Sequence, residues 1–214
     1  MQINPKDGDK TSNYRIMRNL VIPRPIVLVS TVNEAGLANV APFSFFGVVS
    51  AHPPVIGISI GSRRGRDKDT MANARRTREL VINVTTEAMK KGMMISAMDF
   101  PSDESEVQPS GFSTLSSTIV RPPRLAESPA QMECRVTEIM EFGESEQKRN
   151  FIVAEVVMFH VHDAYLRDDG LPDHLQFDII GRLGDDYYWG RKGSFEMKRI
   201  KYENWLKTHT DTSV

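Results

Sequence analysis

The residues best suited to binding chemistry lie at positions 61–70, where hydroxyl and basic side chains precede a predicted helix. The stretch reads Gly-Ser-Arg-Arg-Gly-Arg-Asp-Lys-Asp-Thr, and Asp69 or Thr70 can cap a helix that continues to Arg78. A phosphate monoester needs several converging donors, and hydroxyls, a guanidinium fork and helix N-terminal amides supply them together. By composition alone a solvated basic loop is an equally good interpretation, so this stretch needs support from other features.

A second segment, residues 39–46, combines aromatic surface with a distorted backbone. It reads Asn-Val-Ala-Pro-Phe-Ser-Phe-Phe, and Pro42 supplies no main-chain donor. Amides beside such a proline can escape sheet pairing and face the edge of a planar heteroaromatic ligand. The alternative, which the pattern alone favours, is that the phenylalanines are core residues and Pro42 marks a strand edge.

Other reactive residue types give weaker hypotheses. His160 and His162 share one face of a strand, and with Asp163 or His174 they suggest a metal site, which we reject in favour of no metal. Cys134 falls on the apolar side of an alternating strand, where a small buried hydrophobic residue is the commoner role. No Ser-His-Asp or Cys-His order stands out, and the arginines at positions 75–78 are typical of a solvated helix surface.

The elements that must position these residues are mostly strands. Apolar, β-branched and alternating runs predict strands at residues 25–32, 39–50, 55–60, 80–84, 131–137, 151–161 and 175–180. Helix formers occupy residues 87–98, and residues 101–117 are crowded with Ser, Asp, Glu, Pro and Gly, as in a long loop that contacts a ligand or partner. Strands joined mainly by short turns predict a mainly β protein, an antiparallel barrel with a few peripheral α-helices.

Charge and composition limit the partners. The 214 residues include 27 basic and 28 acidic side chains, for a net charge of -1, so no overall field attracts nucleic acid or a membrane surface. The first fifteen residues contain no apolar signal region, and the single cysteine excludes an internal disulfide. These features lead us to expect a cytoplasmic protein.

The chain resembles the flavin reductase-like family of FMN-binding split barrels through an ordered series of segments. They are Arg-Pro-Ile-Val-Leu-Val-Ser-Thr at 24–31, Asn39 through Phe46, Pro53-Pro54, Lys68-Asp69-Thr70, Leu80 through Asn83, Pro122-Pro123-Arg124, Glu133-Cys134 and Gly181-Arg182-Leu183. The resemblance implies a Greek-key antiparallel split barrel that forms a homodimer and binds FMN. It also implies three parts: an N-terminal extension (1–20), the split-barrel domain (21–190) and a C-terminal tail (191–214).

The resemblance assigns site residues as well. It implies that Asp69 holds the phosphate loop and caps the helix, and that Arg182, and less clearly Tyr188, reach the site from the neighbouring subunit or close over the ring. The implied phosphate contacts are Ser62, Arg64, Lys68 and Thr70. The implied isoalloxazine and ribityl contacts, made largely by main-chain groups, are Thr31, Asn39, Ala41, Pro42, Phe43, Ser44 and Phe45.

The function implied is an oxidoreductase in which hydride passes from NAD(P)H to FMN and electrons then pass to a small-molecule acceptor or a redox protein. No Gly-x-Gly-x-x-Gly follows a strand, so a separate Rossmann site for the nicotinamide nucleotide is not expected. Three alternatives remain open: an FMN electron-transfer module fed by a protein partner without NAD(P)H turnover, a flavin enzyme for one particular small molecule, and an interaction domain without a cofactor. No catalytic side chain is assigned.

Overall fold

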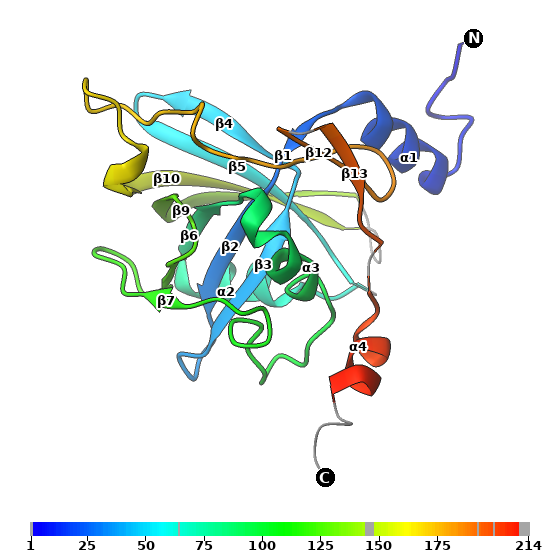
Figure 1. Ribbon diagram of the computed structural model, residues 1–214. Coiled ribbons are helices and arrows are strands. Elements are labelled where there is room, and N and C mark those ends of the chain that lie inside the picture. Colours follow the sequence, from blue (N-terminus) through cyan, green and yellow to red (C-terminus); the bar gives the residue numbers. More distant parts are fainter. Residues whose placement is uncertain (1, 64, 144–147, 192, 199, 210–214) are drawn as a thin grey trace.

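The computed structural model describes residues 2–63, 65–143, 148–191, 193–198 and 200–209 (Figure 1). Its main feature is a seven-stranded antiparallel sheet with the strand order β3-β2-β6-β9-β10-β5-β4. The strands are β2 (Val27–Val32), β3 (Ala38–Phe43), β4 (Phe46–Ala51), β5 (Pro54–Gly61), β6 (Glu79–Val84), β9 (Ala130–Phe142) and β10 (Arg149–Val161). The prediction of a mainly β, antiparallel protein is confirmed.

The two edges of this sheet meet because they are consecutive in the chain. β3 forms one edge and β4 the other, and only Ser44 and Phe45 separate them. The Ser59 main-chain N–H donates to the Phe45 carbonyl at 2.8 Å, which ties the connection to β5. The sheet therefore curls into a barrel that is split beside β3, and the outer main-chain groups of β3 are not paired with another strand of the sheet.

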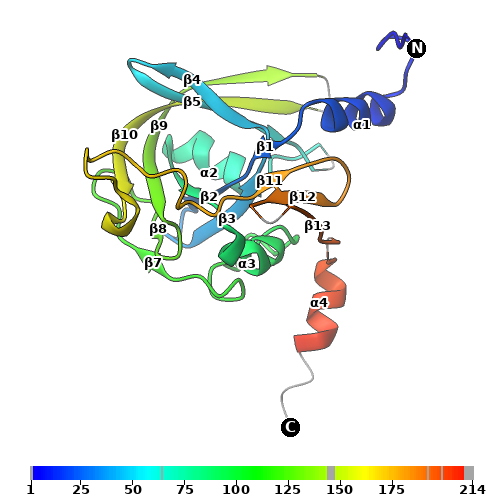
Figure 2. The same cartoon turned by 45° about the horizontal axis from the view of Figure 1, so that its top comes forward.

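Smaller elements surround the barrel. A four-stranded sheet contains β1 (Arg24–Pro25), β11 (Gly181–Arg182), β12 (Tyr187–Gly190) and β13 (Gly193–Glu196), and β7 (Thr114–Leu115) pairs with β8 (Arg124–Leu125). The helices are α1 (Lys10–Leu20), α2 (Asp69–Thr77), η1 (Glu87–Met89), α3 (Lys90–Ile95), η3 (Asp163–Tyr165) and α4 (Tyr202–His209). Figure 2 shows α1 at one side of the barrel and α4 standing away from it.

Two apolar clusters hold these layers together. The first fills the barrel with alternate side chains of the main strands, including Val29, Ile58 and Ile82, and the inward face of α2 through Met71. The second lies outside β2 and β3 and contains the methionines of η1 and α3, together with Leu125, Ile180 and Tyr188. The second cluster anchors α3 against the barrel, on the side where β3 is open.

Three local expectations are corrected. Residues 175–180 do not form a strand, because Leu175 is exposed and only Ile179 makes an isolated bridge, to Thr86. The helix after the basic loop begins at Asp69, so Lys68 occupies the N-cap position, and it makes no side-chain cap bond. Glu133 lies on the charged side of the alternating pattern that places Cys134 on the apolar side, yet it is fully buried.

Burial of Glu133 serves a structural purpose. Its carboxylate accepts the main-chain N–H groups of Thr118, Ile119 and Val120 at 2.6 to 3.0 Å and lies 2.6 Å from His160 Nε2. Burial alone would raise the pKa of Glu133, but these donors lower it to about 2. The carboxylate therefore holds the loop before β8 against the barrel.

Within the described residues, no helix has the length and apolar character that crossing a bilayer requires.

Candidate functional site

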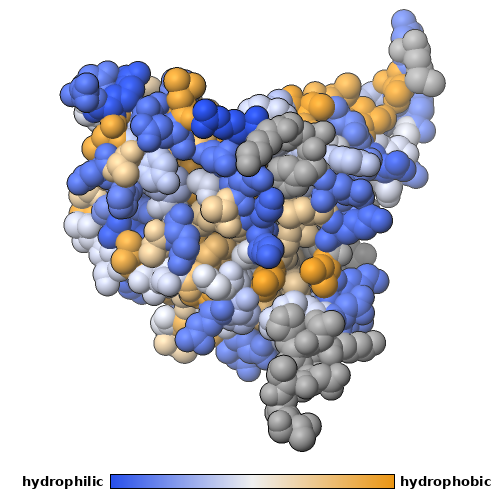
Figure 3. All heavy atoms as spheres, viewed as in Figure 1, coloured by the Kyte–Doolittle hydropathy of each residue, from blue (hydrophilic) through white to orange (hydrophobic). Residues whose placement is uncertain are grey.

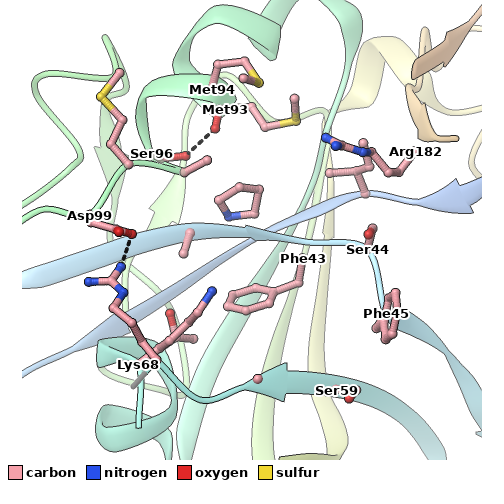
Figure 4. A pocket seen from close by; sticks show the side chains of 18 of the residues that line it. Phe43, Ser44, Phe45, Ser59, Lys68, Met93, Met94, Ser96, Asp99 and Arg182 are labelled. Atoms are coloured by element: carbon pink, nitrogen blue, oxygen red, sulfur yellow. Dashed lines mark hydrogen bonds and ion pairs between the residues drawn. The ribbon is translucent and has the colours of Figure 1, made fainter. Parts of the chain in front are cut away.

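A cavity of about 430 Å³ lies at the split in the barrel, a size within the range of small-ligand sites. The end of β3 and the connection to β4 form one wall, and α3 with the residues after it forms the opposite one. Figure 4 shows Lys68 and Asp99 at one end of the cavity, Arg182 and Phe45 at the other, and Phe43 between them. The cavity is thus elongated, with different chemistry at its two ends.

The first end contains the donors predicted for phosphate. Ser62, Lys68, Asp69 and Thr70 line it, and they belong to the loop after β5 and to the first turn of α2. The first amides of a helix have no intrahelical acceptor and carry a partial positive charge, so this helix terminus favours an anion. Arg63 also lines this end and pairs with Asp99 across the cavity wall.

The middle of the cavity has a flat wall formed by the open edge of the barrel. Ala41, Pro42 and Phe43 at the end of β3, followed by Ser44 and Phe45, line this wall. Met93 and Met94 of α3 lie opposite (Figure 4). Because β3 is an edge strand, its outer carbonyl and N–H groups can face a ligand.

A buried polar network supports this wall from behind. Asn39 Oδ1 accepts the hydroxyls of Thr70 at 2.9 Å and Thr31 at 3.2 Å, and Asn39 Nδ2 donates to Glu106 Oε1 at 2.7 Å. Asn73 of α2 donates to the Thr31 hydroxyl at 3.1 Å. The network therefore joins β2, β3, the start of α2 and the loop that contains Glu106.

Glu106 is the only carboxylic acid in this set of contacts. Burial raises its pKa to about 7, although the N–H of Val40 and the side chain of Asn39 donate to it and so act in the opposite direction. Its two carboxylate oxygens accept these two donors at 2.7 and 3.0 Å. Glu106 therefore links the loop that carries it to Asn39 and to the main chain of β3.

The second end of the cavity combines guanidinium groups with aromatic rings. Tyr14 and Arg18 come from α1, Arg24 from β1, Arg149 from β10 and Arg182 from β11. The guanidinium carbons of Arg149 and Arg24 lie 5.0 and 5.8 Å from the centre of the Phe45 ring. Arg182 donates to the Tyr188 hydroxyl and stacks on that ring. Segments far apart in the sequence thus converge here.

Most of the residues predicted from the sequence line this cavity, while Thr31 lies behind its wall and Arg64 falls outside the described residues. Those that line it are Asn39, Ala41, Pro42, Phe43, Ser44, Phe45, Ser62, Lys68, Asp69, Thr70 and Arg182. Their contacts with FMN stay a prediction. The Thr70 hydroxyl donates to Asn39, so its main-chain N–H is the group that remains for an anion.

Several residues of the cavity were not anticipated. Arg18, Arg24, Arg149 and Glu106 belong to segments interpreted as an extension, a strand start or a loop, and Asp99 and Phe100 follow α3. No local signal marks Arg24 or Glu106, because the burial that sets them apart from other charged residues exists only in the folded structure. No local signal marks Arg149 either, because its position depends on the register between β10 and β5.

The remaining reactive residues lie elsewhere and have structural contacts. His160 contacts Glu133, and His162 accepts the N–H of Ala164 at the start of η3. Burial raises the pKa of the Cys134 thiol, which keeps it protonated in the core. Across the described part of the chain, no group of three or more His, Cys, Asp or Glu side chains is arranged to hold a metal ion.

Comparison with known proteins gives consistent matches. Residues 17–176 match the model of the flavin reductase like domain family. Nitrilotriacetate monooxygenase component B from Bacillus cereus superposes with a TM-score of 0.85 at 29% identity, covering 92% of this chain and 98% of that one. The 2-nitrobenzoate 2-nitroreductase NbaA from Pseudomonas fluorescens superposes with a TM-score of 0.81 at 26% identity, covering 94% and 98%. A split-barrel protein from Shewanella frigidimarina shares the fold at 19% identity, with a TM-score of 0.75 and coverage of 94% and 99%.

Proposed function

The chain belongs to the flavin reductase-like family and has its split-barrel fold, and from this premise we propose that it binds FMN and catalyses NAD(P)H-dependent flavin reduction. One observation carries the proposal. A single elongated cavity has a cationic, donor-rich end at the start of α2 and a flat wall formed by the open edge of β3. These two features match the phosphate and the planar ring of one ligand.

The donors present fit a phosphate monoester. Lys68 supplies a charge, Ser62 a hydroxyl, and the first turn of α2 supplies main-chain N–H groups, so donors approach from different directions. A monophosphate at this end leaves the rest of the cavity for the ring system. We therefore propose FMN rather than FAD as the resident flavin, with Arg63 able to exchange its partner Asp99 for the phosphate.

The chain's own groups would orient the ring rather than react with it. Outer main-chain groups of β3 can meet the polar edge of the ring, while Phe43, Met93 and Met94 exclude water from its faces. Bound FMN would accept hydride from NAD(P)H and deliver electrons onward, which is chemistry that needs no acid or base from the protein. We assign no catalytic residue for this reason.

The hydride donor would enter the same cavity, since the sequence offers no separate Rossmann site. Of the solved neighbours described above, one is named as a monooxygenase component and another as a 2-nitrobenzoate 2-nitroreductase, so their names do not point to one common acceptor. The proposal therefore concerns the flavin and its hydride donor, and leaves the acceptor as a small molecule or a redox protein.

We propose a homodimer as well, and exposed apolar side chains support it. Met17, Leu20 and Val21 are exposed on and after α1, and Val48 and Val49 are exposed on β4. Figure 3 shows apolar surface at the upper right, over α1. Such side chains are costly to leave in water, and a second copy of the chain would cover them.

The decisive experiment follows the visible spectrum of the purified protein with added FMN under anaerobic conditions, with NADH and NADPH introduced in separate samples. Prompt bleaching of protein-bound flavin by either nucleotide is the expected result. Bound flavin that stays oxidised would support the alternative of an electron-transfer module fed by a protein partner. Failure to bind FMN would contradict both functions and leave an interaction domain without a cofactor.

A further inference from the structure

The end of the cavity remote from Lys68 carries more positive charge than its contacts neutralise. Arg18, Arg24, Arg149 and Arg182 line it. The carboxylates that contact them are Asp185, 3.0 Å from Arg18, and Asp186, 3.4 Å from Arg182.

Arg24 instead donates to the main-chain carbonyls of residues 18, 21 and 183, which satisfies its hydrogen bonds without cancelling its charge. Burial first, and then Arg182 and Arg18, lower the pKa of Arg24, as expected in a positive region.

Arg149 is the guanidinium best placed to bind a ligand there. Its position is set by the antiparallel register that pairs Arg149 with Gly61, where a Cβ would lie only 3.4 Å from the guanidinium nitrogen Nη2. The guanidinium stacks against Phe45 at 5.0 Å and Tyr14 at 5.8 Å. Among the described residues it has no hydrogen-bonded or ion-paired acceptor, so its N–H groups keep their capacity for an anion.

Arg18 provides a second observation in favour of an anion at this end of the cavity. The Nε atom of Arg18 is buried and has no hydrogen-bond acceptor in the described structure, while its Nη2 binds Asp185. Arg18 stacks on the same Tyr14 ring at 5.0 Å. A buried donor without an acceptor costs free energy, and the Arg18 guanidinium therefore has hydrogen-bonding capacity that Asp185 does not use.

We propose that Arg149, together with Arg18 and Arg182, forms a second anion subsite that binds a carboxylate or phosphate group of the flavin's redox partner. This inference rests on the proposed function, because the partner must lie beside the flavin. Figure 4 shows Arg182 on the far side of Phe43 from Lys68, so one FMN phosphate cannot occupy both ends of the cavity. Planar guanidinium groups stacked on aromatic rings suit carboxylate and phosphate oxygens, which accept two parallel N–H donors.

Two sources supply this chemistry: the phosphates of the nicotinamide nucleotide, or a carboxylate on the electron acceptor. The test uses FMN-loaded Arg149→Gln, with Arg149→Lys to retain the charge. Arg167→Gln is the matched control, since Arg167 pairs with the exposed Asp169 and does not line the cavity. One arm compares NADH with 1-benzyl-1,4-dihydronicotinamide, a hydride donor without phosphates. The other compares benzoate with neutral benzamide as ligands, detected by perturbation of the flavin spectrum.

We expect Arg149→Gln to raise either the KM for NADH or the Kd for benzoate about tenfold or more. The matching compound without the anionic group, 1-benzyl-1,4-dihydronicotinamide or benzamide, should be unaffected. Arg149→Lys should recover part of the loss, and Arg167→Gln should match the wild type. The arm that responds identifies the source of the anion. Wild-type behaviour of Arg149→Gln in both arms would overturn the subsite.

A different outcome would also overturn it. If Arg149→Gln weakens FMN much more than riboflavin, Arg149 belongs to the FMN phosphate clamp and not to a partner's subsite. Failure of the proposed function is distinguishable, because it would appear in the wild-type protein as absent FMN binding or absent bleaching.

Discussion

At the scale of single residues, two ionisable groups act on the start of α2 from opposite sides. Lys68 precedes the helix at the cavity, and Glu106 holds Asn39, which in turn accepts the hydroxyl of Thr70. In the proposed function Lys68 would act on the FMN phosphate through its charge, whereas Glu106 contacts Asn39 through a hydrogen bond. A substitution at Lys68 should therefore change the affinity for FMN, whereas a substitution at Glu106 should change the pH dependence of stability.

Lys68→Ala should weaken FMN about tenfold to a hundredfold and leave riboflavin nearly unaffected, because only FMN carries the phosphate. Flavin fluorescence quenching measures both affinities. Lys91→Ala, on the exposed part of α3, is the matched control. Thr70→Ala is a poorer probe, since it also removes a bond to Asn39. Equal weakening of both flavins by Lys68→Ala would contradict the phosphate clamp.

Glu106→Gln should reduce the pH dependence of stability. The raised pKa, about 7 against an ordinary 4.5, means that the folded protein holds this proton more tightly than the unfolded chain. The tighter binding of this proton stabilises the folded protein in full below about pH 4.5. That stabilisation is lost as the pH rises to about 7, which lowers the free energy of unfolding by about 1 to 3 kcal/mol. Thermal unfolding of the flavin-free protein from pH 5 to pH 8 measures the difference. Parallel curves for wild type and variant would refute the assignment.

At the scale of elements, the C-terminal helix supports one wall of the cavity. The Phe100 ring, which lines the cavity, contacts Tyr202 and Trp205 of α4 with ring centres 4.8 and 5.7 Å apart. The Tyr202 hydroxyl donates to Glu104 at 3.0 Å. Helix α4 therefore braces both Phe100 and the loop that follows it.

Tyr202→Ala should loosen residues 97–104 and weaken FMN several-fold, because it removes a ring contact and a hydrogen bond from one wall. Hydrogen exchange of the peptide that spans these residues measures the first effect. Tyr202→Phe keeps the ring and should retain most of the protection. Unchanged exchange in Tyr202→Ala would show that α4 does not brace the cavity.

At the scale of the whole molecule, α1 and the β4–β5 hairpin lie along the same upper side of the barrel (Figures 1 and 2). Each presents apolar side chains to solvent, with Leu20 74% and Val48 80% exposed. The Tyr14 and Phe45 rings, 6.3 Å apart, connect α1 to the segment between β3 and β4 beside the cavity. An interface on this side would therefore lie next to the proposed anion subsite.

The molar mass of the wild-type protein should be twice that of one chain, and Val48→Asp should lower it toward the mass of the monomer. A carboxylate at position 48 could not be buried in the dimer interface without a large cost in free energy. Light scattering coupled to size-exclusion chromatography gives the masses. Glu155→Asp, a conservative change on β10, serves as control. A monomeric wild type at micromolar concentration would contradict the homodimer.

Local sequence patterns by themselves determined most of the strands and part of the candidate site. Alternating and β-branched runs placed most main strands of the antiparallel barrel, and residue types at 39–45 and 61–70 located two walls of the cavity. These features depend on near neighbours in the chain, and local patterns report them well. The run at 175–180, in which Leu175 is exposed and Ile180 buried, was misread as a strand because an apolar pattern does not reveal whether a neighbouring strand pairs with it.

Only the tertiary structure decided the rest of the site. Closure of the sheet brings Arg18, Arg24, Arg149 and Arg182 together from α1, β1, β10 and β11, and folds the loop over Asn39 so that Glu106 is buried. Periodicity shows which face of an element is apolar, but strand register and the packing of distant segments determine which faces meet. The sequence of residues 61–70 could therefore predict the donor-rich end of the cavity, whereas the arginine-rich end required the closed barrel.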